Sequence, residues 1–186
     1  TYIPLSIGTA FINGGAISAL GLNLSATVGN DIIYNTIGTA PNRVFVVQWT
    51  NAQRVASPGD FNFQIRLNES SNTINIVYGA CAPTGATVYT AQVGIRSATN
   101  LFPQSDVKNR LQTGTNINFP WQAKTIEGTT SASSVRTSAT EYPNNGLTYT
   151  YTPSLPCTTP TANASALVIG VTNVTATSFI GNSFTP

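Results

Sequence analysis

Apolar and polar residues alternate strictly along residues 60–68, DFNFQIRLN. Successive side chains of a strand point to opposite faces, so the segment has one apolar face and one polar face. The apolar face comprises Phe61, Phe63, Ile65 and Leu67, and the polar face comprises Asp60, Asn62, Gln64, Arg66 and Asn68. The turn sequence SSNT follows, and the alternation resumes at Ile74, Ile76 and Tyr78. This arrangement predicts a β-hairpin.

The same kind of pattern predicts further short strands over residues 16–24, 31–38, 44–50, 87–97 and 147–153. Between residues 98 and 141 the alternation is lost among Ser, Thr, Asn and Gly. There we expect one or two irregular strands, for example over residues 118–124. No amphipathic helical stretch reaches a dozen residues. Many short strands separated by Gly, Asn and Pro turns favour an all-β, antiparallel β-sandwich.

Both tryptophans have a structural and a functional interpretation. Trp49 alternates with Phe45 and Val47 and is predicted to point into the core. Trp121 follows Pro120 in the irregular region. It either fills a loop or presents an exposed platform for a sugar ring, so it is kept as a candidate ligand-binding residue.

The composition of the chain changes after residue 153. Residues 154–165 are rich in Pro and Thr, which is typical of a linker between domains. Residues 166–186 resemble the first strands of an Ig-like or fibronectin type III module. Such a module ordinarily needs about 100 residues, so we expect a truncated segment that is poorly packed or paired with another chain. Residues 1–153 form the predicted sandwich domain.

Charge excludes some classes of partner. Only 8% of the 186 residues are charged and the net charge is +2, against a usual charged share of about 25%. The basic residues are dispersed along the chain, so they form no basic patch of the kind that binds nucleic acid.

No apolar run approaches the roughly 18 residues that a membrane-spanning helix needs, so we expect no membrane insertion. Because the chain contains no Met, we expect it to be a processed or excised fragment.

Two cysteines, Cys81 and Cys157, leave two alternatives open. In an oxidising compartment they form one disulfide, and otherwise they are two unpaired thiols. Two cysteines without any histidine cannot supply four zinc ligands. Asp31 and Asp60 are isolated, so they indicate at most a weak calcium site, and no other cofactor is expected.

Several segments together carry a family resemblance: GTAPNRVFVVQWTN, DFNFQIRLNESSNTINIVYG, AQVGIRSATN and PNNGLTYTYTP followed by CTTP. The chain resembles the concanavalin A-like jelly-roll modules of secreted and cell-surface proteins of gliding bacteria. The resemblance implies type IX secretion, a following fibronectin-like module, and roles in adhesion, gliding or carbohydrate contact. Family members carry a further segment of the kind NGYIxLG upstream. Its absence predicts a sandwich that is incomplete at the N-terminus and has an unpaired edge.

The sequence offers no catalytic constellation. Jelly-roll glycosidases place paired carboxylates in one cleft, whereas the glutamates Glu69, Glu127 and Glu141 are far apart in this sequence. A Ser-His-Asp triad is excluded because the chain has no histidine. We therefore expect that the chain is not an enzyme.

The best candidate for binding is the outward row Asn62, Gln64 and Arg66, with Asn75 across the hairpin. Amide and guanidinium groups can bind a glycan through paired hydrogen bonds, and simple solvation is the alternative.

The sequence therefore favours a noncatalytic extracellular module of a larger secreted or surface protein, acting in adhesion or carbohydrate attachment. One alternative is a subunit of an extracellular filament, sheath or shell that assembles by strand complementation. Another is an accessory domain of a secreted hydrolase. The expected partners are a glycan or cell-surface ligand, neighbouring modules, or copies of the chain itself.

Overall fold

The structure is a computed structural model of the chain. It describes residues 3–5, 15–25, 32–55, 57–85, 87–96, 107–112, 121, 125–128 and 130–153. The chain divides into two units, Thr1–Thr152 and Pro153–Pro186. The described strands lie in the first unit. The predicted linker and the predicted module over residues 166–186 lie outside the described residues.

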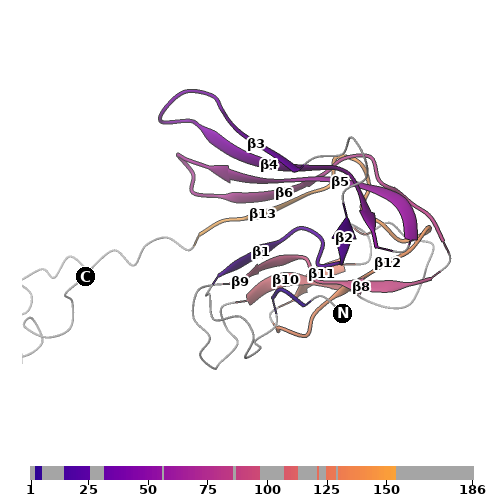
Figure 1. The fold of residues 1–186 in the computed structure, drawn as a ribbon. Coiled ribbons are helices and arrows are strands. Elements are labelled where there is room, and N and C mark those ends of the chain that lie inside the picture. The colour runs from indigo at the N-terminus through magenta and orange to yellow at the C-terminus, as the bar shows by residue number, and fades with distance from the viewer. Residues whose placement is uncertain are drawn as a thin grey trace, which may run out of the picture. The chain divides into compact units, whose positions relative to one another are not determined.

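Seven strands form the large sheet, and all of its pairings are antiparallel (Figure 1). Its main order is β13 (Thr148–Tyr151), β6 (Ile74–Tyr78), β5 (Ser57–Asn68), β4 (Val44–Arg54) and β2 (Leu24–Ser25). In addition, β3 (Ile32–Ile37) pairs with β4, and β7 (Ala82–Pro83) pairs with β5. The hairpin predicted from the alternation is therefore β5–β6, and it lies in the middle of this sheet.

A small sheet faces the large one (Figure 1). Its order is β1 (Ala16–Ser18), β9 (Gly94–Arg96), β10 (Val107–Gln112) and β11 (Thr125–Gly128). A separate antiparallel pair, β8 (Tyr89–Ala91) and β12 (Val135–Thr137), continues this layer. The prediction of an all-β antiparallel sandwich is confirmed. The jelly-roll connectivity stays a prediction.

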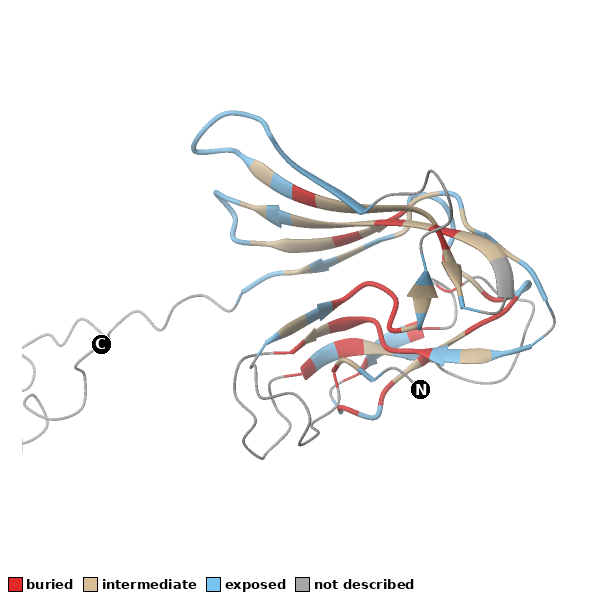
Figure 2. Cartoon of the chain, viewed as in Figure 1, coloured by how far each residue is buried: buried red, intermediate tan, exposed pale blue. Residues whose placement is uncertain are grey.

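The core lies between the two layers (Figure 2). Its buried members are Ala19, Leu20, Phe61, Phe63, Ile76, Tyr78, Ala91, Val93, Trp121 and Val135. The Tyr78 hydroxyl donates a 2.5 Å hydrogen bond to the carbonyl oxygen of Ala19, which ties β6 to the segment after β1. Burial raises the pKa of Tyr78 well above its ordinary value, so the phenol stays a neutral donor.

Trp49 packs against this core, as its alternation with Phe45 and Val47 predicts. Its ring stacks on that of Phe63, the residue opposite it on β5, with a centroid separation of 4.9 Å. Offset stacking of this kind adds to the free energy gained by burying apolar surface. The prediction that Trp49 points inward is confirmed.

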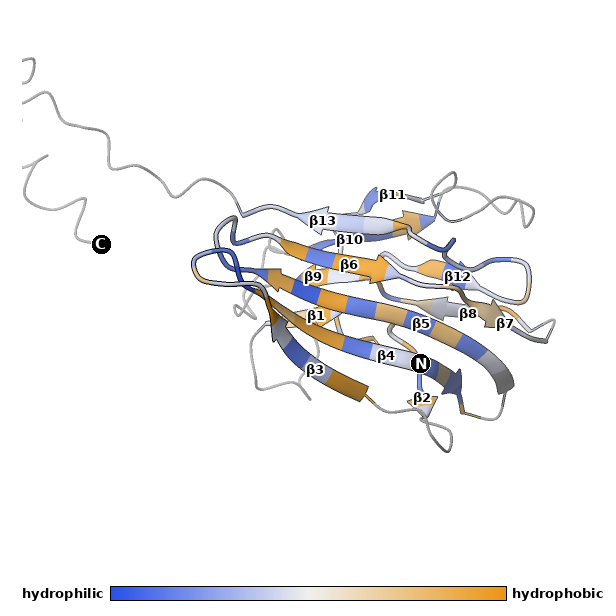
Figure 3. Ribbon diagram, turned by 90° about the horizontal axis from the view of Figure 1, so that it is seen from above, coloured by the Kyte–Doolittle hydropathy of each residue, from blue (hydrophilic) through white to orange (hydrophobic). Residues whose placement is uncertain are grey.

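Alternation along β5 is visible as bands of opposite hydropathy, whereas β4 begins with a continuous apolar stretch over residues 44–47 (Figure 3). On the inner face of β5, burial decreases toward the hairpin turn: Phe61 and Phe63 are each 4% exposed, whereas Leu67 is 38% exposed. One end of this face is thus covered, and the other remains partly open to solvent.

Two predicted strands are wrong in extent because the chain changes sheets within them. Residues 16–24 contain β1 in the small sheet and β2 in the large one. Between them, the Gly21 N–H donates a 2.9 Å hydrogen bond to the carbonyl oxygen of Gln92. Residues 87–97 likewise contain β8 and β9, which pair with different strands. Apolar residues continue across both crossings, so the sequence pattern does not reveal them.

Three strands, β10, β11 and β12, occupy the region where alternation is lost. The sequence predicts one or two irregular strands in this region but not their positions, because several of the buried side chains are polar: Asn109, Thr125 and Thr137 are each at most 5% exposed. The close approach of β9 and β10 also requires Gly94, whose φ is +149°. A Cβ there would lie 2.3 Å from the carbonyl oxygen of Lys108. The strand expected over residues 118–124 lies outside the described residues except for Trp121.

Candidate functional site

The outer side of the large sheet carries the candidate binding surface, here called the polar face. It consists of Gln48, Gln64, Arg66, Asn68, Asn75 and Thr150. The sheet register places Arg66 opposite Asn75 and Asn75 opposite Thr150. Three of the four residues predicted as an outward row, Gln64, Arg66 and Asn75, therefore lie together on neighbouring strands.

Side-chain hydrogen bonds run along the polar face. Arg66 Nε donates to Gln64 Oε1 at 2.7 Å, and Gln64 Nε2 donates to Gln48 Oε1 at 2.5 Å. Gln48 Nε2 then donates to Thr50 Oγ1 at 3.0 Å. Within the described part of the chain, the two terminal guanidinium nitrogens of Arg66 have no hydrogen-bond partner. They are the strongest donors that this surface leaves available.

A second set of bonds continues toward β13. Asn75 accepts a hydrogen bond from Asn68 Nδ2 and donates one of 2.8 Å to Thr150 Oγ1. Asn68 Nδ2 also donates to the carbonyl oxygen of Thr73 at 3.0 Å. These bonds fix the rotamers of the amides, so the surface presents its donors and acceptors in a set order.

Asn62, the fourth residue of the predicted row, has a different environment. Its Oδ1 accepts the Asn51 N–H at 2.7 Å, and its Nδ2 donates to the Ala80 carbonyl oxygen at 2.5 Å. The β4–β5 register shifts between Trp49 and Ala52, and Asn51 has a φ of +49°. Asn62 points outward like Gln64, two residues further along β5, but both ends of its amide are used to fasten a β-bulge.

Trp121 is fully buried, which corrects its candidacy as an exposed sugar platform. Its indole Nε1 donates a 2.9 Å hydrogen bond to the Arg136 carbonyl oxygen. The ring meets Tyr78 edge to face, with centroids 5.7 Å apart. A large aromatic ring with its N–H satisfied fills the core here, so the interpretation of Trp121 as a packing residue is the right one.

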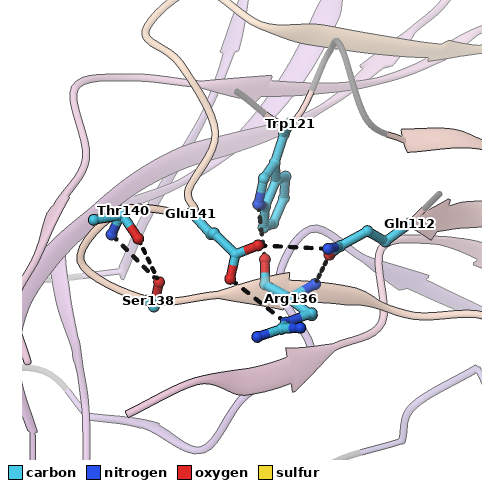
Figure 4. Close-up of polar contacts among 6 residues, drawn as sticks. All are labelled: Gln112, Trp121, Arg136, Ser138, Thr140 and Glu141. Atoms are coloured by element: carbon cyan, nitrogen blue, oxygen red, sulfur yellow. Dashed lines mark hydrogen bonds and ion pairs between the residues drawn. The ribbon is translucent and has the colours of Figure 1, made fainter. Parts of the chain in front are cut away.

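Near Trp121 lies a buried carboxylate, Glu141, which has no exposed surface (Figure 4). Its Oε2 is 3.5 Å from Arg136 Nε, and its Oε1 accepts from Gln112 Nε2 at 3.4 Å. Gln112 Oε1 in turn accepts the Arg136 N–H at 2.7 Å. Since the carboxylate is enclosed, substrate in solution cannot reach it. The cluster fastens β10 to β12 instead.

The other described glutamates are exposed and paired. Glu69 binds Arg43 with a closest separation of 2.5 Å, and Glu127 binds Lys108 at 2.8 Å. The hydrogen bond from Arg43 lowers the pKa of Glu69 to about 2, and the bond from Lys108 lowers the pKa of Glu127. Both carboxylates are therefore ionised at neutral pH. Each glutamate has a different cationic partner, and the described residues contain no group of three potential metal ligands.

The cysteine and calcium predictions remain untested. Cys81 is half-buried and has no disulfide partner among the described residues, and burial raises the pKa of its thiol. Cys157 lies outside the described residues, so the Cys81–Cys157 disulfide stays a prediction. Asp31 also lies outside them, while Asp60 Oδ1 accepts a long 3.5 Å hydrogen bond from Gln53.

The sequence reasoning missed one cleft, of about 470 Å³, beside β10 and β13. Its lining includes Lys108, Arg110, Tyr149 and Tyr151. The Arg110 guanidinium carbon lies 4.7 Å from the centre of the Tyr149 ring. Burial raises the pKa of both tyrosines, so they are neutral. The alternating tyrosines of residues 148–151, TYTY, are the feature of the sequence that indicates this cleft. The proximity of Arg110 to them depends on the fold.

The fold and this surface define the class of protein as an antiparallel β-sandwich module. A family model described as NIDO related matches residues 6–153, which is most of the chain. The chain therefore belongs to the NIDO-related family. No curated protein and no solved structure matches the chain.

Membership of this family is compatible with an extracellular module. Among the described residues there is no helix of the length and hydropathy needed to cross a membrane. The finer resemblance, to concanavalin A-like modules with type IX secretion and a following fibronectin module, stays a prediction.

Proposed function

We propose that this chain is a noncatalytic, secreted or surface-exposed module that attaches a larger protein to hydroxylated polymers such as carbohydrate. The observation that carries the proposal is the polar face. There Gln64, Arg66 and Asn75 lie together, and the terminal nitrogens of Arg66 lack partners among the described residues. A guanidinium beside ordered amides can donate to and accept from neighbouring sugar hydroxyls.

The polar face suits weak, repeated contact. It is one side of a sheet, and its bonds to a ligand replace bonds to water, so each bond contributes only about 0.5–1.5 kcal/mol net. Several modules, or several sites on one polymer, would raise the effective concentration and give useful avidity. The low charge of the chain favours neutral ligands over strongly acidic ones.

The absence of catalysis is part of the proposal. Glu69, Glu127 and Glu141 are each bound to a different cation, and Glu141 is enclosed. Glycosidases instead need two carboxylates facing one sugar, about 5–10 Å apart. Any hydrolysis by the larger protein would then come from residues outside this chain.

Binding of the chain to a panel of immobilised polysaccharides tests the proposal. We expect Arg66→Ala to weaken binding about tenfold, since a hydrogen bond from a charged donor contributes about 1.5–3 kcal/mol. Gln64→Ala should weaken it less. Lys108→Ala is the matched control, because it removes one exposed positive charge from the small sheet and should leave binding unchanged. Equal losses in the Arg66 and Lys108 variants, or no binding by the native chain, would contradict the proposal. So would release of sugar by the chain alone.

A further inference from the structure

The strand β3 is an edge of the large sheet, and it is unusually apolar. It pairs with β4 along its whole length and with no second strand among those described. All six of its residues are exposed (Figure 2). Its large apolar side chains are Ile32 (59% exposed), Ile33 (52%), Tyr34 (75%) and Ile37 (51%). These side chains project from both faces of the strand. Packing of the other layer of the sandwich against one face of β3 would therefore not explain why both faces are apolar.

The usual protections of an edge strand are missing from β3. Proteins commonly guard such edges with charged residues, proline or a bulge. The sequence IIYNTI has neither charge nor proline, and its register with β4 is regular over all six residues. One polar group partly covers the edge: Asn35 Oδ1 accepts the Thr36 N–H at 2.8 Å.

That hydrogen bond also reveals which backbone groups are free. Because the Thr36 N–H bonds to a neighbouring side chain, it points away from β4 and toward the open edge. Backbone groups of alternate residues point to the same side of a strand. The N–H and C=O groups of Tyr34 therefore face the open edge as well and can accept a new strand.

The partner must be a neutral strand with apolar side chains on both faces. No charge on β3 can attract an acidic or basic segment, and the nearby Arg43 and Glu69 neutralise each other. β3 itself has this composition. We propose that β3 pairs antiparallel with β3 of a second copy of this chain, which joins the two large sheets into one continuous sheet. The inference does not rest on the proposed function.

A two-fold axis at Asn35 gives the most favourable register. Residues then lie opposite partners on the same face, as a continuous sheet requires. Ile33 meets Ile37 of the second copy on the outer face, and Tyr34 meets Thr36 of the second copy on the inner face. Apolar and aromatic–β-branched pairs of this kind stabilise a sheet. The Tyr34–Thr36 pairs lie at the open edge and exchange backbone hydrogen bonds, for which the Thr36 N–H leaves Asn35 Oδ1. The two Asn35 residues then face each other as a pair without backbone hydrogen bonds.

The size of the contact predicts how tightly two copies associate, and its symmetry predicts how many copies associate. Pairing of one six-residue strand buries less than the roughly 1,200–2,000 Å² of a stable interface, so the association should be reversible and dependent on concentration. The contact uses the same strand on both copies and is then closed. It therefore produces dimers and not filaments.

Light scattering or sedimentation over a range of concentrations tests the inference. The native chain should approach a dimer, and Ile33→Lys should weaken dimerisation at least about tenfold. Ile126→Lys is the matched control, because Ile126 on β11 is an isoleucine of nearly equal exposure, 51%, and it should dimerise normally. Circular dichroism confirms that each variant is folded. A native chain that stays monomeric, a continued growth beyond dimers, or equal losses in both variants would overturn the inference.

Cross-linking tests the register directly. In a Cys81→Ser, Cys157→Ser background, Asn35→Cys should form a disulfide-linked dimer under mild oxidation. Directly opposite residues have Cβ atoms about 4.5–5.5 Å apart, which is close to disulfide distance. Thr150→Cys is the control, since Thr150 is an exposed residue in the middle of β13, at the other end of the sheet order. Cross-linking through both positions or through neither contradicts pairing at β3.

Discussion

At the scale of single residues, Glu141 and Glu69 show how burial changes the role of a carboxylate. Both are bound to an arginine, but Glu141 is fully enclosed whereas Glu69 lies at an exposed turn. An enclosed charge that loses its partner cannot be compensated by water. An exposed pair is largely compensated by solvent and salt. Mutation of Glu141 should therefore cost much more stability than mutation of Glu69.

Replacing Glu141 with alanine should destabilise the chain by about 3–5 kcal/mol, because the partly buried Arg136 then lacks its counterion. Urea denaturation measures the loss. The double substitution Glu141→Leu with Arg136→Met should recover much of it, since apolar residues of similar volume can replace a buried pair. Glu127→Ala, which breaks an exposed pair, is the control and should change little. A Glu141→Ala loss as small as that of Glu127→Ala would contradict the enclosed ion pair.

The Arg43–Glu69 pair predicts a dependence of stability on pH. The folded-state pKa of Glu69, about 2, lies below its ordinary value of 4.5. A lowered pKa contributes stability that is present above pH 4.5 and is lost as the pH falls toward about 2. Thermal melts between pH 2 and 6 should therefore show a smaller acid loss of Tm for Glu69→Gln than for the native chain. Identical pH profiles for the two proteins would show that the pair is not formed in solution.

At the scale of elements, the two layers are joined by few but specific contacts. The Tyr78 hydroxyl on β6 reaches the Ala19 carbonyl oxygen beyond β1. The edge-to-face contact of its ring with Trp121, whose indole N–H donates to the Arg136 carbonyl oxygen on β12, adds to the junction. The Tyr78 side chain therefore helps to hold the small sheet over the hairpin.

Tyr78→Phe tests this junction. It keeps the ring but leaves a buried carbonyl without its donor, which should cost about 1–3 kcal/mol of unfolding free energy. Tyr34→Phe removes an equivalent hydroxyl from a side chain that is 75% exposed and should be neutral. Equal stabilities of the two variants, measured by chemical denaturation, would show that the Tyr78 hydrogen bond is not important for stability.

At the scale of the whole molecule, the described core residues all belong to the unit Thr1–Thr152. This unit should therefore fold cooperatively without the residues that follow it. Deletion of residues 154–186 should leave the Tm of the remaining chain within about 2 °C, because no described core contact is removed. Scanning calorimetry of both chains measures this. A large fall in Tm, or loss of the cooperative transition, would mean that the second unit completes the sandwich.

The large sheet could be predicted from the sequence because its central hairpin alternates apolar and polar residues, as strands with one buried face do. DFNFQIRLN alternates between apolar and polar residues, and Ile74, Ile76 and Tyr78 continue the inward row on the next strand. Phe61, Phe63, Ile76 and Tyr78 of these rows lie in the buried core. Trp49 was placed correctly on the same basis. The outward row was also predicted, since Gln64, Arg66 and Asn75 share a face by parity alone.

Only the tertiary structure decided the rest, because those positions depend on partners that are distant along the chain. Asn109 and Glu141 are buried through hydrogen bonds and an ion pair, and Thr137 is buried at 1% exposure. Polar residues at buried positions leave no apolar periodicity to recognise. The crossings near Gly21 and Gln92 preserve local alternation while exchanging one sheet for the other. Likewise, the pattern of residues 32–37 predicts a strand, but only the order of the strands shows that it is an open edge. Local alternation thus determined the faces of strands, and long-range pairing determined which of those faces and edges remain exposed.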